Sequence, residues 1–191
     1  MTNLAMRPAL VLLGLVAVFA LQMHPQNPAP GKPAGKDVYQ GLRNLALTGS
    51  RAKLGLPATS EPTDPWGIMM DWGVTRGTAT VVAFSDGSAS IYLSSGGGFL
   101  GGQAHESIRN AAKAMVAAAA RCRHQAHAVT SYPLPQQGEV AFYFLTDAGV
   151  FTASAPQDAL SSHRHPLSEL GEAAQAVIAQ YRLITQKAPA Q

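Results

Sequence analysis

The sequence contains a single cysteine, Cys122, and charged residues make up only 13% of its 191 residues. One cysteine excludes an intramolecular disulfide, so the fold must be stabilised by its hydrophobic core. Low charge does not indicate disorder here, because 47% of the residues are apolar. Lysines and arginines are scattered and the net charge is only +3. This pattern argues against a nucleic-acid partner, which requires a basic stripe with aromatic platforms.

The longest apolar run lies near the N-terminus. Residues Ala9 to Leu21 contain no polar side chain, and Arg7 is the only charged side chain before them. A basic start followed by an apolar stretch of this length is typical of a secretory signal. Extended to Met23, the run would form a helix of roughly 22 Å, shorter than the bilayer core of about 30 Å. We therefore expect residues 1–23 to be a signal peptide or, alternatively, a single-pass membrane anchor.

A spacer follows this segment. Four prolines and two glycines occur within residues 24–35, a composition typical of an extended, semi-rigid linker. We expect residues 24–36 to form the linker, 37–187 a single domain, and 188–191 a tail. This layout predicts a domain exported to the periplasmic side of a membrane or secreted, with the membrane itself as a partner through residues 1–23.

The first helix of the domain is predicted to start at Asp37 and to stop near Gly49. Val38, Leu42 and Leu45 fall on one face of this helix. Further along, apolar segments bounded by turn residues predict five strands, of which the second and third are joined by a two-residue Asp86-Gly87 turn. The predicted strands are 66–74, 78–84, 88–94, 139–146 and 149–155. Two longer helices are predicted at about 104–124 and from about Pro166 onward.

This order, α-βββ-α-ββ-α, predicts an α+β fold after an N-terminal apolar helix, with helices packed on an antiparallel or mixed five-stranded sheet. Over residues 37–186 the order resembles that of type III secretion chaperones and YbjN-like proteins, and of profilin-like roadblock domains. The resemblance implies a protein-binding module that can dimerise. It rests on element order, so it assigns no functional residue.

A glycine-rich turn between the third strand and the helix at 104–124 is the most unusual local sequence. Gly96, Gly98 and Gly101 match G-x-G-x-x-G, and Gly97 and Gly102 add to it. Such a turn before a helix can hold an anion on its N–H groups. However, no acid occurs between residues 107 and 138, so the dinucleotide fingerprint is incomplete. The alternatives are a small-ligand site or a tight structural crossover with Phe99 and Leu100 in the core.

Three ionisable residues could accompany that turn. His105 and Glu106 follow it directly, and Asp71 from the first strand could complete an acid–base group. The structural alternatives are that Glu106 complements the helix N-terminus and that Asp71, if buried, has a partner within the fold.

The spacing C-x-H-x-x-H at Cys122, His124 and His127, together with His163 and His165, contains residue types that bind zinc. Cys122 falls on the apolar face of its predicted helix, so we expect it to be a core residue and expect neither a metal site nor a cofactor.

The sequence thus favours a non-enzymatic, exported or membrane-tethered interaction module that binds a protein partner or itself. The alternative is a small-ligand-binding or hydrolytic domain that uses the Gly96–Gly102 turn with His105, Glu106 and Asp71.

Overall fold

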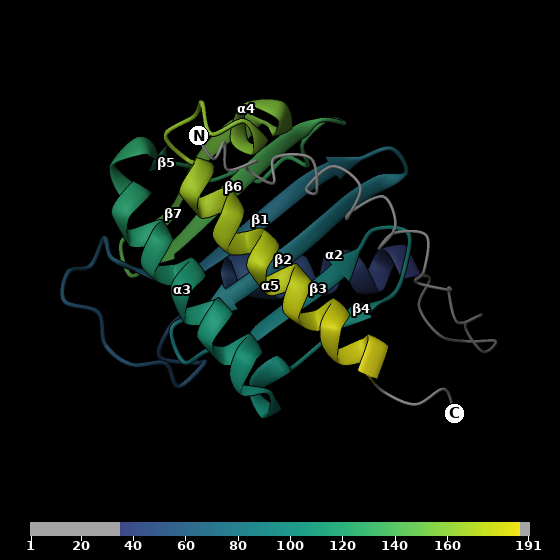
Figure 1. Ribbon diagram of the computed structural model, residues 1–191. Coiled ribbons are helices and arrows are strands. Elements are labelled where there is room, and N and C mark those ends of the chain that lie inside the picture. The colour runs from purple at the N-terminus through teal and green to yellow at the C-terminus, as the bar shows by residue number, and fades with distance from the viewer. Residues whose placement is uncertain (1–34, 188–191) are drawn as a thin grey trace, which may run out of the picture.

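The computed structural model describes residues 35–187, which fold around one continuous sheet (Figure 1). The expected N-terminal apolar helix, the linker as far as residue 34 and the tail at 188–191 lie outside these residues. None of the helices between residues 35 and 187 is long and apolar enough to cross a membrane.

The sheet has seven strands in the order β4-β3-β2-β1-β6-β7-β5, and every pairing is antiparallel. The five strands that the sequence predicted are present within one or two residues of their expected bounds: β1 (Pro65–Val74), β2 (Gly77–Phe84), β3 (Ala89–Leu93), β6 (Glu139–Thr146) and β7 (Gly149–Pro156).

The expected number of strands was wrong, because two further strands extend the sheet at its edges. These are β4 (Gly98–Phe99), paired with β3, and β5 (His127–Ala128), paired with β7. Each has only two residues, which is too short to show an alternating pattern. The α+β class is confirmed.

The β2–β3 connection also differs from its prediction. It spans residues 85–88, and Gly87 has a positive φ of 91° whereas Asp86 does not. The Asp86 carboxylate instead accepts hydrogen bonds from the backbone and the hydroxyl of Ser88. A two-residue type I′ turn would need positive φ at both central residues, so the loop is longer than expected.

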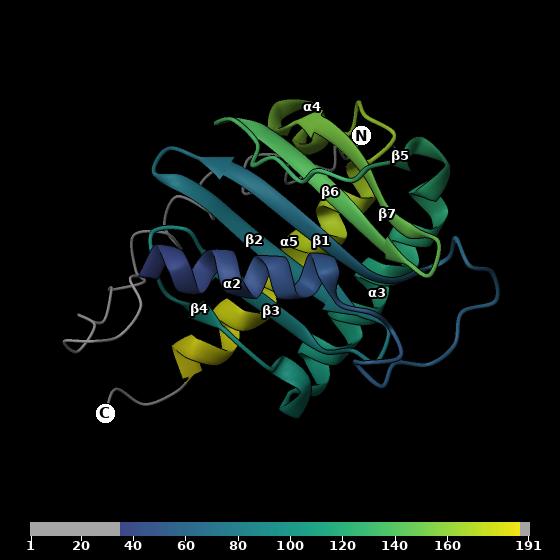
Figure 2. The same cartoon turned by 180° about the vertical axis from the view of Figure 1, so that it is seen from behind.

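Two long helices cover one face of the sheet and one helix covers the other. Helices α3 (Glu106–Cys122) and α5 (Ser168–Lys187) lie on the face seen in Figure 1, with the short α4 (Gln157–Ser161) near one end of α5. Helix α2 (Gly35–Thr48) lies across the opposite face in Figure 2. Two single turns of 3-10 helix, η1 (Gly102–Ala104) and η2 (Arg123–Gln125), flank α3.

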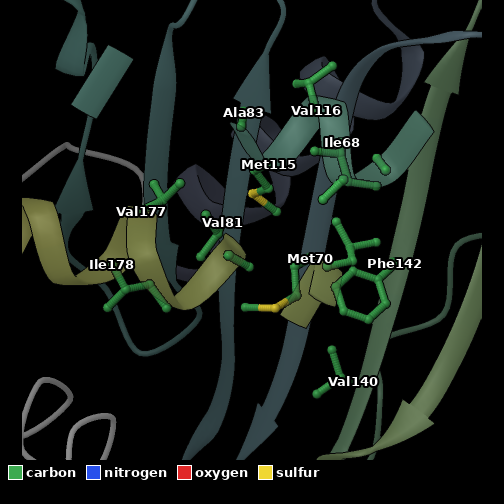
Figure 3. Close-up of a cluster of buried hydrophobic side chains, with 14 of the residues drawn as sticks. Ile68, Met70, Val81, Ala83, Met115, Val116, Val140, Phe142, Val177 and Ile178 are labelled. Carbon is green, nitrogen blue, oxygen red and sulfur yellow. The ribbon is translucent and has the colours of Figure 1, made fainter. Parts of the chain in front are cut away.

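The alternation of side chains in the central strands produces two separate cores. In β6, Val140, Phe142 and Phe144 point to α3 and α5, whereas the residues between them point to α2. Figure 3 shows the larger core, where Met115 of α3 and Val177 of α5 lie near side chains of β1, β2 and β6. The smaller core, beneath α2, contains Tyr39, Leu47 and Met69.

Most of the apolar face expected for the first helix does not form this contact. Val38 and Leu45 are 47% and 64% exposed, and only Leu42, which is partly buried, packs against the smaller core. The helix turns Tyr39, Arg43, Ala46 and Leu47 to the sheet instead. It thus has an inner face with polar groups and an outer face with exposed aliphatic side chains.

Candidate functional site

A buried ion pair joins α2 to the sheet. Asp71, in the middle of β1, is fully buried and lies on the α2 side. The Nε of Arg43 donates a hydrogen bond to its Oδ2 at 2.8 Å, and the Nη2 lies 2.6 Å from the same oxygen. Its Oδ1 accepts a hydrogen bond from the Thr80 hydroxyl at 2.5 Å, and that hydroxyl lies 2.9 Å from the Tyr39 hydroxyl. Asp71 is therefore paired on both oxygens.

The electrostatics of this group match a closed structural network. Burial raises the pKa of Asp71, while Arg43 and Thr80 favour its charged form. Burial opposes the charge of Arg43, but the neighbouring carboxylate raises its pKa. The guanidinium also lies 5.4 Å from the centre of the Tyr143 ring. Burial raises the pKa of Tyr39 to about 12. The charges of this network compensate one another and hold α2 in place.

The structure does not bring Asp71 together with His105 and Glu106. His105 is the N-cap of α3 and Glu106 is in its first turn, and both are exposed. Helix α3 packs on the sheet face opposite α2, so the sheet separates these two residues from Asp71. An acid–base group of these three residues is not assembled.

The glycine-rich turn forms the β3–β4 hairpin. The backbone N–H of Leu93 donates to the carbonyl of Gly97, and the N–H of Gly96 donates to the carbonyl of Leu93. Gly101 and the η1 turn, which starts at Gly102, then separate this hairpin from α3. The glycines of the hairpin therefore do not lead directly into a helix N-terminus.

Two of these positions require glycine for steric reasons. A Cβ at Gly98 would lie 2.2 Å from the carbonyl oxygen of Ile91. A Cβ at Gly102 would lie 2.5 Å from the hydroxyl of Tyr181, which itself donates to the carbonyl of Ala89 at 2.6 Å. Both close approaches join the hairpin to the core and would be blocked by any side chain.

The tip of the hairpin lies beside the start of α2. A Cβ on Gly35, the first residue of α2, would lie 3.3 Å from the Cα of Gly96. Phe99 is partly buried and stacks on Tyr181 with ring centres 5.4 Å apart, as the structural alternative expected. Leu100 does not enter the core, since it is 64% exposed.

The residues considered as zinc ligands have other surroundings in the fold. Cys122 is buried, and burial raises the pKa of its thiol. His163 lies 2.7 Å from Glu172, and the Nδ1 of His165 accepts from the backbone of Leu167. Within residues 35–187, no three histidine, cysteine or acidic side chains gather in a group that could hold a metal ion.

A row of apolar residues follows the outer side of α2, and we call it the α2 stripe: Val38, Gly41, Leu42, Leu45 and, beyond the helix end, Leu54. Leu42 lies at its edge and also packs against the smaller core. At 3.6 residues per turn the four helical members lie within an arc of about 100°. Leu54 is 41% exposed, and its Cδ1 would lie 3.7 Å from a Cβ on Gly49, the residue that follows α2. Among the exposed side chains described in α2, only Asp37 is charged.

Sequence reasoning missed the role of Arg43. The available signal was its position: Arg43 follows Tyr39 by four residues, on the side of the helix away from Val38 and Leu45. The position of Asp71 in an apolar strand was the second signal, because a buried acid needs a partner.

No protein-family model matches this chain, and no curated protein or solved structure is significantly similar to it.

Proposed function

We propose that this chain is a non-enzymatic, exported or membrane-tethered module that binds a protein partner or itself, and that the α2 stripe is its binding surface. The observation that carries the proposal is the orientation of α2. The helix exposes Val38 and Leu45 while its inner face holds an arginine. Scattered exposed apolar residues are common, but an aligned and nearly uncharged row on one helix is typical of an interaction site.

The position of α2 in the chain supports a tethered module. The helix begins at Gly35, directly after the apolar segment and the Pro/Gly-rich residues that we interpret as leader and linker. A surface on the first helix is thus the part of the folded domain nearest in sequence to the membrane.

The disposition of the ionisable groups favours binding over hydrolysis. The one fully buried acid, among the residues that the structure describes, is paired with Arg43. His105 and Glu106 lie on the other side of the sheet. A general acid or base needs a substrate within hydrogen-bond reach, and Asp71 is enclosed on both oxygens.

Photo-crosslinking in the native host tests the binding surface. A photoreactive amino acid at position 45 of the full chain is expected to give a discrete adduct with a protein, whereas the same group at Ala117 is not. Ala117 is a matched control because it is exposed on α3, on the opposite face of the molecule. Equal or absent adducts at both positions would contradict the proposal.

Fractionation tests the tether. A C-terminally tagged full chain is expected in the membrane or exported fraction and to be digested by protease only after the outer barrier is opened. A soluble cytoplasmic chain with its N-terminus intact would contradict the tethered or exported address.

A further inference from the structure

Helix α2 supplies few apolar side chains to the core beneath it. Among its described side chains, Tyr39, Ala46 and Leu47 are the buried apolar ones, and the fourth buried side chain is that of Arg43. The helix crosses its face of the sheet as a separate element (Figure 2). Helix α3, on the other face, has seven buried residues: Ile108, Ala112, Met115, Val116, Ala118, Ala119 and Cys122. Because hydrophobic stabilisation grows with the apolar area removed from water, apolar burial holds α2 more weakly than α3.

The polar contacts of α2 fix its position but add little to the free energy of docking. The Arg43 guanidinium meets the Asp71 carboxylate, and the Tyr39 hydroxyl lies 2.9 Å from that of Thr80. Removing two charges from water costs free energy that offsets much of their attraction. If α2 leaves the sheet, both charges and both hydroxyls regain water. The network is therefore specific in geometry and modest in net strength.

The chain that follows α2 allows the helix to move without the sheet. Residues 49–64 contain no helix or strand. The Nε of Arg51 lies 2.8 Å from the Asp147 carboxylate, and the backbone N–H of Ala148 donates to the carbonyl of Pro62. These contacts fasten the connection to the β6–β7 turn independently of α2. The helix can thus leave the sheet while the connection keeps its place.

We infer that α2 is a strap that opens as one unit, residues 35–48, while the sheet, α3 and α5 remain folded. Weakly fastened elements open at a lower free energy than the whole fold. The inference goes beyond the proposed function, because it concerns the motion of the helix, whichever partner the α2 stripe binds.

Opening changes what this face of the molecule presents. The closed strap covers the Asp71 carboxylate together with Met69, Val82 and Tyr143, all of which are buried. The open strap exposes an acid amid apolar and aromatic side chains, and it frees α2 from a fixed orientation. The closed and open molecules therefore differ in both charge and apolar surface on this face.

Thiol labelling of the full chain purified from its host tests the strap. Single cysteines are placed in a Cys122→Ala background by Ala46→Cys on α2 and by Ala141→Cys, which lies opposite Asp71 in the β1–β6 pairing. Ala83→Cys and Ala119→Cys are matched controls, because these alanines are fully buried in the larger core. When closing is faster than labelling, the labelling rate reports the population of the open state.

The two positions at the α2 interface are expected to react together. Ala46→Cys and Ala141→Cys should be labelled at similar rates, at least roughly a hundredfold faster than the two controls. Their labelling should depend weakly on low concentrations of urea, whereas that of the controls should rise steeply, because only global unfolding exposes the larger core.

Three other outcomes overturn the inference. Equal rates and equal urea dependence at all four positions would show that α2 leaves the sheet only when the whole fold unfolds. Fast labelling at Ala46→Cys alone would show that the helix frays without uncovering the sheet. Fast labelling at Ala141→Cys alone would show that another segment opens. The photo-crosslinking test of the α2 stripe is unaffected by any of these results.

Hydrogen exchange of the unsubstituted chain supplies a second test. An isolated helix of 14 residues is marginal in water, so an opened α2 loses its internal hydrogen bonds. The backbone N–H groups of residues 43–47 should exchange at least roughly a hundredfold faster than those of residues 112–119. Exchange of both segments at one rate with one urea dependence would overturn the inference.

Discussion

The Nε of Arg43 donates to the carboxylate of Asp71 at 2.8 Å in an interior where Asp71 is fully buried and Arg43 is 3% exposed. This contact joins α2 to the central strand of the sheet. Because a buried charge pair is strongly dependent on geometry, it holds the helix in one rotation about its own axis. The same rotation turns Val38 and Leu45 outward, so the buried pair determines which side of α2 is exposed.

Replacement of the buried acid Asp71 is expected to destabilise the fold strongly. Asp71→Asn leaves Arg43 charged and uncompensated, which should lower the free energy of unfolding by about 3–5 kcal/mol. Chemical denaturation of the two proteins measures this difference. Glu169→Gln is the matched control, because it removes the exposed ion pair between Arg121 and Glu169 and should leave the free energy of unfolding almost unchanged.

The coupling between the two residues can be measured separately. The double variant Arg43→Met with Asp71→Asn should lower the free energy of unfolding by less than the sum of the two single variants. No unpaired buried charge remains once both residues are changed. Strictly additive costs would show that the two side chains do not interact directly.

Stability should fall at alkaline pH through the buried tyrosines. Burial raises the pKa of Tyr181 from near 10 to about 12. Below pH 10 the hydroxyl is protonated in both states, so its contribution is fully present. Between pH 10 and 12 the unfolded chain releases this proton and the folded chain retains it, so the free energy of unfolding decreases as pH rises. Tyr39, whose pKa is also raised to about 12, acts in the same direction.

Tyr181→Phe isolates the contribution of one hydroxyl. At pH 9 the variant should be less stable than the parent, because it loses the hydrogen bond to Ala89. By pH 11.5 the parent should have lost about 2 kcal/mol that the variant does not lose. Parallel stability curves for the two proteins over this range would contradict the assignment.

Substitutions of glycine should have opposite effects on stability at crowded positions and at open positions. Gly102→Ala places a methyl group 2.5 Å from Tyr181 and Ile108 and should destabilise the fold by about 1–3 kcal/mol. Gly41→Ala meets no atom within 4 Å and should stabilise the protomer by about 0.5–1 kcal/mol. Thermal and chemical unfolding of both variants give the comparison, and equal effects would show that crowding does not distinguish the two sites.

The α2 stripe should matter for association and little for folding. Val38→Ser with Leu45→Ser changes two side chains that are 47% and 64% exposed, so the free energy of unfolding should change by less than about 0.5 kcal/mol. The same variant should lose the protein adduct formed from position 42 by photo-crosslinking. Retention of that adduct at the parent level would show that binding does not use these side chains.

The sheet and its long helices could be predicted from the sequence because their patterns are strong. Ile108, Met115 and Cys122 recur at helical spacing and are all buried in α3. Phe142 and Tyr143 alternate between the two cores as β6 requires. In contrast, β4 and β5 have only two residues each, and β5 pairs with β7 more than twenty residues further along the chain, so no local pattern indicates them.

The inner face of α2 could not be predicted from hydropathy. Val38, Leu42 and Leu45 form the more apolar side of the helix, and a hydropathy pattern directs that side to a core. The helix faces the sheet with Arg43 instead, because Asp71 on β1 provides a charge partner 28 residues away in sequence. Such a pairing depends on strand register, which becomes known only once the sheet is assembled.

The most direct test of the binding surface is the rate of thiol labelling at position 45. In a Cys122→Ala background, Leu45→Cys is labelled with a membrane-permeant maleimide in the intact host and again after the chain is purified and diluted, and Ala117→Cys is treated in the same way. If a partner covers the α2 stripe in the cell, Leu45→Cys should be labelled roughly tenfold more slowly in the host than in the diluted chain, with no such difference at Ala117→Cys. Equal labelling of Leu45→Cys in the two settings would show that the α2 stripe is unoccupied in the cell and would contradict the proposed binding surface.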